Sequence, residues 1–97
     1  MVRYVVLLKF TDKGVSALKD SPSRAETFKT TASRLGATVE GQYWTLGMFD
    51  GALILSAPDD ATATAAVLSL DRQDCVHTCM LRAFDAAEFK NVLAKVT

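Results

Sequence analysis

The sequence has little of what several protein classes require. It holds two cysteines and one histidine, and its eleven lysine and arginine residues are balanced by eleven aspartate and glutamate residues. Two cysteines cannot build the disulfide framework of a small secreted domain, and an iron–sulfur cluster takes four. A formal net charge of zero argues against a protein that binds nucleic acid or an anionic membrane, because both kinds of binding depend on a basic excess.

Long apolar runs are also missing. The longest, Tyr4–Leu8 and Ala52–Leu55, fall far short of the ~20 residues that cross a bilayer. The N-terminal residues lack the extended apolar region and the small-residue cleavage site of a signal peptide. We therefore expect no membrane contact and a cytoplasmic location.

What is present is the composition of one small folded domain. The chain has 97 residues, of which 49% are hydrophobic and 23% are charged. This balance is typical of a globular protein, and the length leaves room for a single core. We expect one domain over residues 1–97.

The pattern of apolar and turn residues predicts seven elements. Strands are expected at 2–10, 38–46, 52–57 and 76–84, and helices at 22–35, 61–70 and after Asp85. Ser21-Pro22 is typical of a helix N-cap followed by the first helical residue, and Gly36 of a left-handed helix end. Asp85 and Glu88 have the spacing of a capping box. The order β-α-β-β-α-β-α predicts an α+β fold of the ferredoxin-like kind: a four-stranded antiparallel sheet with two helices on one face, plus a C-terminal helix.

Such a fold leaves one face of the sheet uncovered, and here that face is apolar. Depending on strand parity it presents Val5 and Leu7, Leu53 and Leu55, or Cys79 and Leu81. An apolar face of this kind marks an association surface, and two sheets packed face to face form a homodimer with a barrel-like interior. In the alternative, the C-terminal helix folds back over the open face of its own sheet.

One turn carries a family resemblance. The segment Tyr43–Gly51 contains Gly47-x-Phe49-Asp50-Gly51 and resembles the GYD-domain family, which is named for a glycine, tyrosine and aspartate in this turn. Further matching segments are Phe10–Gly14, Ser21–Ala25, Ala57–Asp60 and Leu81–Phe84. The resemblance implies a ferredoxin-like domain of the dimeric α–β barrel kind, with no agreed catalytic residue. Phe49 stands where the family has tyrosine, so this chain lacks that hydroxyl.

Two residues are candidates for catalysis, and each has a plainer interpretation. Asp50 lies in the glycine-flanked turn, where it either accepts backbone N–H bonds or places a carboxylate at the rim of a pocket as a base or ligand anchor. His77 is the only histidine and is either a general base or a half-exposed side chain near a strand start.

A ligand pocket is expected between the sheet and the helices or at the dimer interface. Its candidate residues are Tyr43, Trp44, Asp50, His77 and Arg82. Strand parity places Trp44 on the same face as Gln42, with Tyr43 on the opposite face. Arg82 either binds an anionic ligand or forms an ion pair with Asp50 or Glu40.

No metal site and no cofactor are expected. Cys75, His77 and Cys79 alternate and so share one face of an extended strand, but the two cysteines are then ~13 Å apart. Ligands on one straight strand cannot converge on a tetrahedral ion with bonds of ~2.3 Å. The cysteines are either buried as small hydrophobes or, in a dimer, shared in a site across the axis.

These observations leave three hypotheses for function. The first is a homo-oligomeric small-molecule-binding or regulatory protein that uses no cofactor and whose partner is a second copy of itself. The second is a cofactor-free enzyme acting on a small organic molecule in a cleft, and the third is a purely structural oligomer. A cavity in which His77 and Asp50 converge favours the enzyme.

Overall fold

The computed structural model describes all residues from Met1 to Thr97. The elements are β1 (Val2–Phe10), α1 (Asp12–Ser16), the 3₁₀ helix η1 (Leu18–Asp20), α2 (Ser21–Arg34), β2 (Thr38–Trp44), β3 (Gly51–Ala57), α3 (Asp60–Asp71), β4 (Val76–Ala83) and α4 (Ala86–Leu93). The predicted order of strands and main helices is confirmed, with α1 and η1 added in the connection that leads to α2.

The four strands form one antiparallel sheet in the order β2-β3-β1-β4. β1 lies between β3 and β4, so that Val6 stands opposite Leu53 on one side and Met80 on the other. Gly41 follows a register shift in β2, as expected of a glycine at a bulge. This topology is the ferredoxin-like α+β fold.

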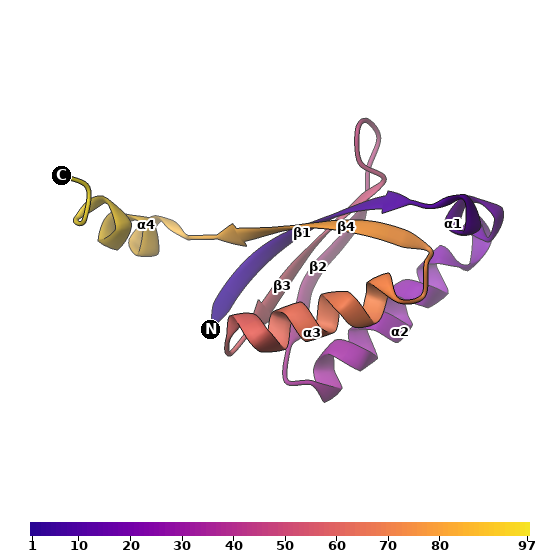
Figure 1. Cartoon of the computed structure of the whole chain (residues 1–97), viewed down its shortest axis with the longest axis horizontal. Coiled ribbons are helices and arrows are strands. Elements are labelled where there is room, and N and C mark those ends of the chain that lie inside the picture. Colours follow the sequence, from indigo (N-terminus) through magenta and orange to yellow (C-terminus); the bar gives the residue numbers. More distant parts are fainter.

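The core lies between the sheet and the pair α2 and α3, which both cover the same sheet face (Figure 1). β1 contributes Tyr4, Val6 and Leu8, the alternating residues that point toward the helices. α2 contributes Phe28 and Ala32, which lie one helical turn apart on its buried side. Small residues on α3 bring that helix close to the sheet, because its buried positions include alanines 63 and 66.

The opposite face of the sheet carries no helix of its own chain (Figure 1). The strand register places Ile54 and Leu81 on either side of Val5, all on this uncovered face. Leu53 and Leu55 are fully buried against the helices instead. The sequence left open which of three residue pairs face outward. The structure shows that Val5 with Leu7 and Cys79 with Leu81 do so. We call this surface the outer face.

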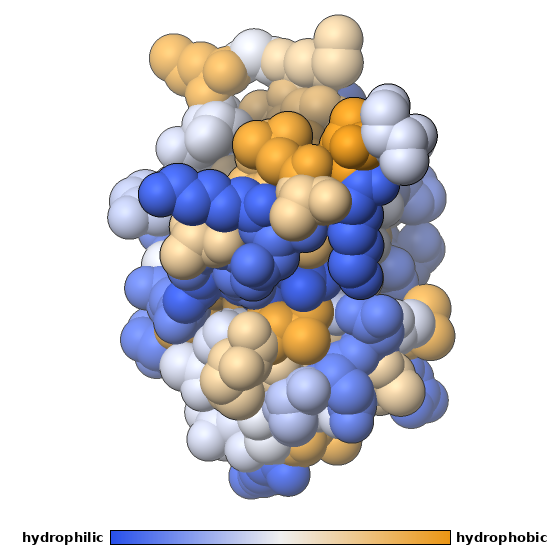
Figure 2. All heavy atoms as spheres, turned by 90° about the vertical axis from the view of Figure 1, so that its left-hand side faces the viewer, coloured by the Kyte–Doolittle hydropathy of each residue, from blue (hydrophilic) through white to orange (hydrophobic).

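α4 does not cover the outer face, so the alternative in which it folds back over its own sheet is wrong. The helix continues beyond the end of β4 and projects from the body (Figure 1). The predicted capping box is present: Asp85 accepts from the Glu88 N–H, and Glu88 accepts from the Asp85 N–H. Figure 2 looks at this end of the molecule and shows apolar side chains gathered above a band of charged ones. Phe89 and Leu93 are about half exposed.

The start of α2 differs from the prediction by one residue. Asp20 is the N-cap and makes no side-chain capping bond, and Ser21 is the first helical residue with Pro22 after it. The Ser21 hydroxyl is engaged elsewhere, because it accepts a hydrogen bond from Trp44. The left-handed end at Gly36 is confirmed by its φ of 91°.

Candidate functional site

The turn between β2 and β3 is anchored to the end of β1 by Asp50. Its carboxylate accepts the Phe10 N–H at 2.8 Å, and its own N–H donates to the Leu8 carbonyl at 2.8 Å. This is the geometry expected of a turn aspartate that satisfies backbone donors. A role for Asp50 as a base or ligand anchor stays a prediction.

Further hydrogen bonds fix the shape of the same hairpin. The Thr45 hydroxyl donates to the Phe49 carbonyl at 2.7 Å, and Lys9 Nζ donates to the Met48 carbonyl at 3.0 Å. The side chains at its tip are nevertheless in water, since Leu46 is 102% exposed and Met48 is 79% exposed. The hairpin projects beyond the sheet (Figure 1). It is thus a fixed loop that displays two apolar side chains.

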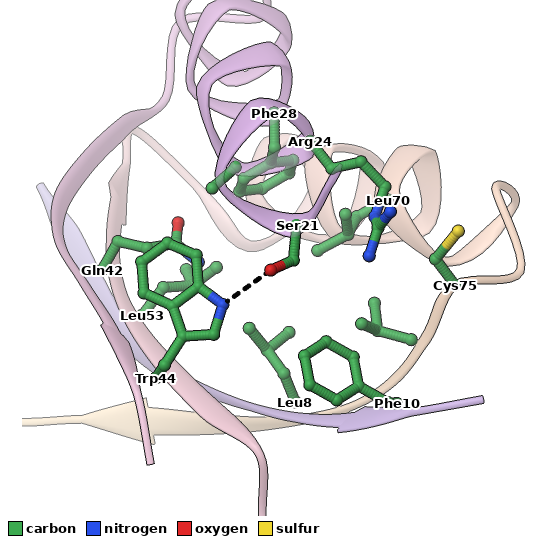
Figure 3. Close-up of a pocket in the computed structure, with 12 residues that line it drawn as sticks. Leu8, Phe10, Ser21, Arg24, Phe28, Gln42, Trp44, Leu53, Leu70 and Cys75 are labelled. Carbon is green, nitrogen blue, oxygen red and sulfur yellow. Dashed lines mark hydrogen bonds between the residues drawn. The ribbon is translucent and has the colours of Figure 1, made fainter. Parts of the chain in front are cut away.

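Trp44 lies at the mouth of a pocket between the sheet and α2. As predicted, Gln42 and Trp44 share the face that points toward the helices, and both line this pocket (Figure 3). The indole Nε1 donates to Ser21 Oγ at 3.2 Å, which links β2 to the first turn of α2. The pocket has a volume of about 50 Å³ and a mainly apolar lining. It reaches past Phe10 to Cys75 at the far end (Figure 3).

A larger groove of about 380 Å³ lies beside this pocket, between α2 and the edge strand β2. The two share Ala25, Gln42 and Trp44 as lining residues. The indole ring therefore stands between a small apolar pocket and an open surface groove.

Three of the five candidate residues also line a smaller cavity of about 20 Å³, namely Tyr43, Trp44 and Asp50. Their side chains otherwise lie apart. Tyr43 is 62% exposed and stands opposite Ala52 on the outer face. His77 is exposed and stands opposite Lys9 on the same face, in the adjacent strand β4. None of the four main cavities is lined by His77. His77 and Asp50 therefore do not converge on one of these cavities.

The prediction that Cys75, His77 and Cys79 share one face is wrong for Cys75. β4 begins at Val76, and Asp74 before it has a φ of 62° that turns the chain. Cys75 is consequently buried and lines the Trp44 pocket, whereas Cys79 is exposed on the outer face.

Arg82 does not form the predicted ion pair. Glu40 instead pairs with Arg3, with Nε and Oε2 3.0 Å apart, and the Asp50 carboxylate takes the Phe10 N–H. The Arg82 guanidinium lies 4.5 Å from the centre of the Phe84 ring and 5.8 Å from that of Tyr4. Arg82 Nη1 also donates to the carbonyls of Arg3, at 3.4 Å, and Ala83. Its interactions are therefore cation–π contacts and backbone hydrogen bonds.

One polar contact was not predicted. The hydroxyl of the buried Tyr4 donates to the carboxylate of Asp60 at the start of α3. Burial, followed by the neighbouring Asp60 carboxylate, raises the pKa of Tyr4 to about 12. Tyr4 and Asp60 are 56 positions apart in sequence, so no local sequence pattern predicts their contact.

The five candidate residues thus do not form one site. Trp44 lines the pocket, Asp50 fixes the hairpin, Tyr43 and His77 lie on the outer face, and Arg82 lies over aromatic rings. A ligand-binding role for them stays a prediction. Sequence reasoning also missed Ser21 and Arg24, which accompany Trp44 in the pocket. The sequence feature that could have pointed to both residues is their position in the first turn of the predicted helix α2.

The fold and the fixed hairpin define a class, the small ferredoxin-like α+β domains with one uncovered sheet face. A family model described as "GYD domain" matches residues 4–93. A curated protein of Thermus thermophilus is 33% identical over 89 residues, which cover 91% of this chain and 94% of that protein. It is named "Glutamine synthetase and cystathionine beta-lyase binding protein". This chain belongs to the GYD family.

No solved structure matches the chain. Its helices are all too short or too polar to span a membrane.

Proposed function

We propose that this protein is a non-catalytic binding protein that works as a homodimer and attaches to a metabolic enzyme. The observation that carries the proposal is where its exposed apolar side chains lie. Exposed apolar side chains lie at the hairpin tip, at Leu81 on the outer face and along α4, and the half-buried Val5, Leu7 and Ile54 extend the apolar outer face. These are surfaces rather than a cleft in which acid and base groups meet. Exposed apolar surfaces of this kind are typical of protein–protein interaction sites.

The outer face is the surface for a second copy. Its centre is made of Val5, Leu7, Ile54 and Leu81, contributed by three neighbouring strands. No helix of the chain covers them (Figure 1). Two such sheets packed face to face bury both apolar surfaces and give a dimeric α–β barrel.

The hairpin tip is the surface for the partner enzyme. Leu46 and Met48 are among the most exposed apolar side chains of the molecule. The hydrogen bonds that Thr45 and Lys9 donate, and the one that Asp50 accepts, hold the loop in one shape before binding. A preorganised loop loses less conformational entropy when it binds, so its apolar contacts contribute more to affinity.

The likeness to the T. thermophilus protein supplies the class of partner. That relative is named for binding glutamine synthetase and cystathionine β-lyase, and it matches this chain over nearly the full length of both. We take these two enzymes, from the protein's own host, as the first partners to test. The protein then works in the cytoplasm, with metabolic enzymes.

Capture of purified glutamine synthetase and cystathionine β-lyase by the immobilised protein tests the proposal. We expect the wild type to capture at least one of them. The double variant Leu46→Ser with Met48→Ser should weaken capture at least about tenfold, because truncating central apolar contacts commonly costs about 2 kcal/mol or more. The double variant should stay dimeric.

The matched control is Leu68→Ser. Leu68 is 59% exposed on α3, away from the hairpin, and its variant should capture the enzyme as the wild type does. Failure of the wild type to capture either enzyme would overturn the enzyme partner. A monomeric double variant would assign the hairpin to the dimer interface instead.

A further inference from the structure

We propose that the pocket behind Trp44 is a binding site for a small organic carboxylate, with Arg24 as the group that recognises its charge. This site is separate from the hairpin and from the outer face, and the inference goes beyond binding of an enzyme.

The first observation is a buried donor without a partner. Nη1 of Arg24 donates to the Ala17 carbonyl at 2.9 Å, but Nη2 is buried and has no hydrogen-bond partner. Arginine remains charged at all ordinary pH values, so a buried N–H of its guanidinium is costly unless an acceptor meets it. An acceptor supplied from outside the chain removes this cost.

The second observation is that no carboxylate of the chain neutralises this cation. The only ion pair joins Arg3 to Glu40. The first turn of α2 contains no acidic residue, and the acidic N-cap Asp20 opposes the partial positive charge of the helix end but forms no ion pair with Arg24. The unpaired charge of the Arg24 guanidinium therefore favours an anion.

The third observation is the arrangement of polar and apolar groups in the pocket. Figure 3 shows the Arg24 guanidinium directed into the pocket beside Leu70, with the Ser21 hydroxyl in the adjoining turn. Nine of its twelve lining residues are hydrophobic, and they include Leu8, Phe10, Phe28 and Leu53. Ser21 and Arg24 thus lie on the α2 side of the pocket. The third polar residue, Gln42, lies across from Arg24 beside Trp44, and the space between them is mostly apolar (Figure 3).

This layout selects a monoanion with an apolar body. One guanidinium N–H pairs naturally with a carboxylate oxygen. A phosphate dianion is better served by several converging donors, and here one cation faces a mostly apolar lining. The volume of about 50 Å³ suits a body of only a few carbon atoms, because one water already needs roughly 10–15 Å³ by the same measure.

The groove beside the pocket allows the site to accept longer carboxylates. Trp44, Gln42 and Ala25 border both spaces, so a longer ligand reaches the groove when the indole moves aside. One hydrogen bond, from Trp44 to Ser21 at 3.2 Å, ties the ring to α2. Trp44 is also the only tryptophan, which makes its fluorescence a direct report on the pocket.

The test compares 3-methylbutanoate with 3-methylbutanamide, which have the same apolar body but differ in charge. Binding to the full chain is followed by Trp44 fluorescence and by ligand-observed NMR. We expect a saturable response to the carboxylate and at least about tenfold weaker binding of the amide, since hydrogen bonds to charged groups are the stronger kind. Acetate should bind more weakly than 3-methylbutanoate, because it lacks the apolar body.

Arg24→Gln removes the charge, and Arg34→Gln is its matched control. Arg34 is exposed at the other end of the same helix. We expect carboxylate affinity to fall at least about tenfold in Arg24→Gln and to stay at the wild-type value in Arg34→Gln. Equal binding of carboxylate and amide, no saturable carboxylate binding, or unchanged affinity in Arg24→Gln would each overturn the proposal.

The comparison of carboxylate with amide needs no variant, so the proposal stays testable even if Arg24→Gln fails to fold. Failure of the carboxylate-site proposal can also be distinguished from failure of the proposed enzyme-binding function. Enzyme capture depends on the hairpin, and a wild type that captures an enzyme but binds no carboxylate would overturn only the pocket.

Discussion

Tyr4 has two structural roles, one for its ring and one for its hydroxyl. Its ring packs in the core, and its hydroxyl leaves the core to meet Asp60 on α3. Arg82 lies over the ring, with its guanidinium carbon 5.8 Å from the ring centre. The residue therefore ties β1 to the first turn of α3 through a polar contact at the edge of an apolar core.

Tyr4→Phe tests this contact. The variant keeps the ring but loses the hydrogen bond, so we expect the free energy of unfolding at neutral pH to fall by about 1 kcal/mol. Asp60 is exposed and is resolvated in the variant, which keeps the loss modest. Chemical denaturation of the wild type and the variant measures it.

The pH dependence follows from the raised pKa of Tyr4, which lies at about 12 against an ordinary 10.0. The fold favours the protonated phenol. Its contribution is fully present below pH 10 and is lost as the pH rises toward 12. Wild-type stability should therefore decline over this range more steeply than that of Tyr4→Phe. Parallel curves for the two proteins would contradict the contact.

How far single residues could be predicted depended on whether their partners were local. The backbone-binding role of Asp50 was one of two interpretations of its turn, and the opposite faces of Tyr43 and Trp44 followed from strand parity. The ion pair expected for Arg82 was wrong because Glu40 is held by Arg3. Arg24 was missed, since the sequence shows a cation but not that one of its nitrogen atoms is buried.

At the scale of elements, α1 is a short helix whose close packing depends on Gly14. A Cβ added there would lie 2.1 Å from the Cys75 carbonyl oxygen. The Thr11 N–H donates to that same carbonyl at 3.0 Å. The glycine thus lets α1 rest against the segment that leads into β4.

Gly14→Ala should therefore destabilise the protein, although alanine is the better helix former. The methyl group forces backbone apart, and overpacking of this kind costs about 1–3 kcal/mol. Ser16→Ala in the same helix is the control and should change stability by less than about 1 kcal/mol. Thermal denaturation compares them, and a Gly14→Ala protein as stable as the wild type would contradict the close approach.

The element boundaries show what local patterns encode. β1 was predicted with its observed bounds, since it is a short run rich in β-branched and aromatic residues, and α3 was predicted to within a residue at each end. β2 stops at Trp44, two residues early, because Thr45 turns its hydroxyl to Phe49 in the hairpin. The projection of α4 could not be predicted, because an amphipathic pattern is the same whether or not the helix packs on its own chain.

At the scale of the whole molecule, the fold is asymmetric. One sheet face is covered by α2 and α3, and the other offers apolar side chains from three strands to the solvent. A domain of this size buries only about two thirds of the surface of its unfolded chain. The topology was predictable from the order of elements. Which alternate residues of each strand face the helices, and which therefore form the outer face, could be determined only from the structure.

A charge placed on the outer face should separate the copies. Leu81 is 46% exposed on β4, so Leu81→Lys leaves the core intact while it places an ammonium in the apolar interface, where burial is costly. Leu68→Lys on α3 is the matched control. We expect Leu81→Lys to be a folded monomer and Leu68→Lys to remain a dimer.

The most direct test of the account is the mass of the wild-type protein in solution, measured by native mass spectrometry together with light scattering. Pairing of two chains of 10.5 kDa through the outer face predicts a species of about 21 kDa. A folded wild-type monomer of 10.5 kDa at micromolar concentration, with its outer face in water, would contradict it.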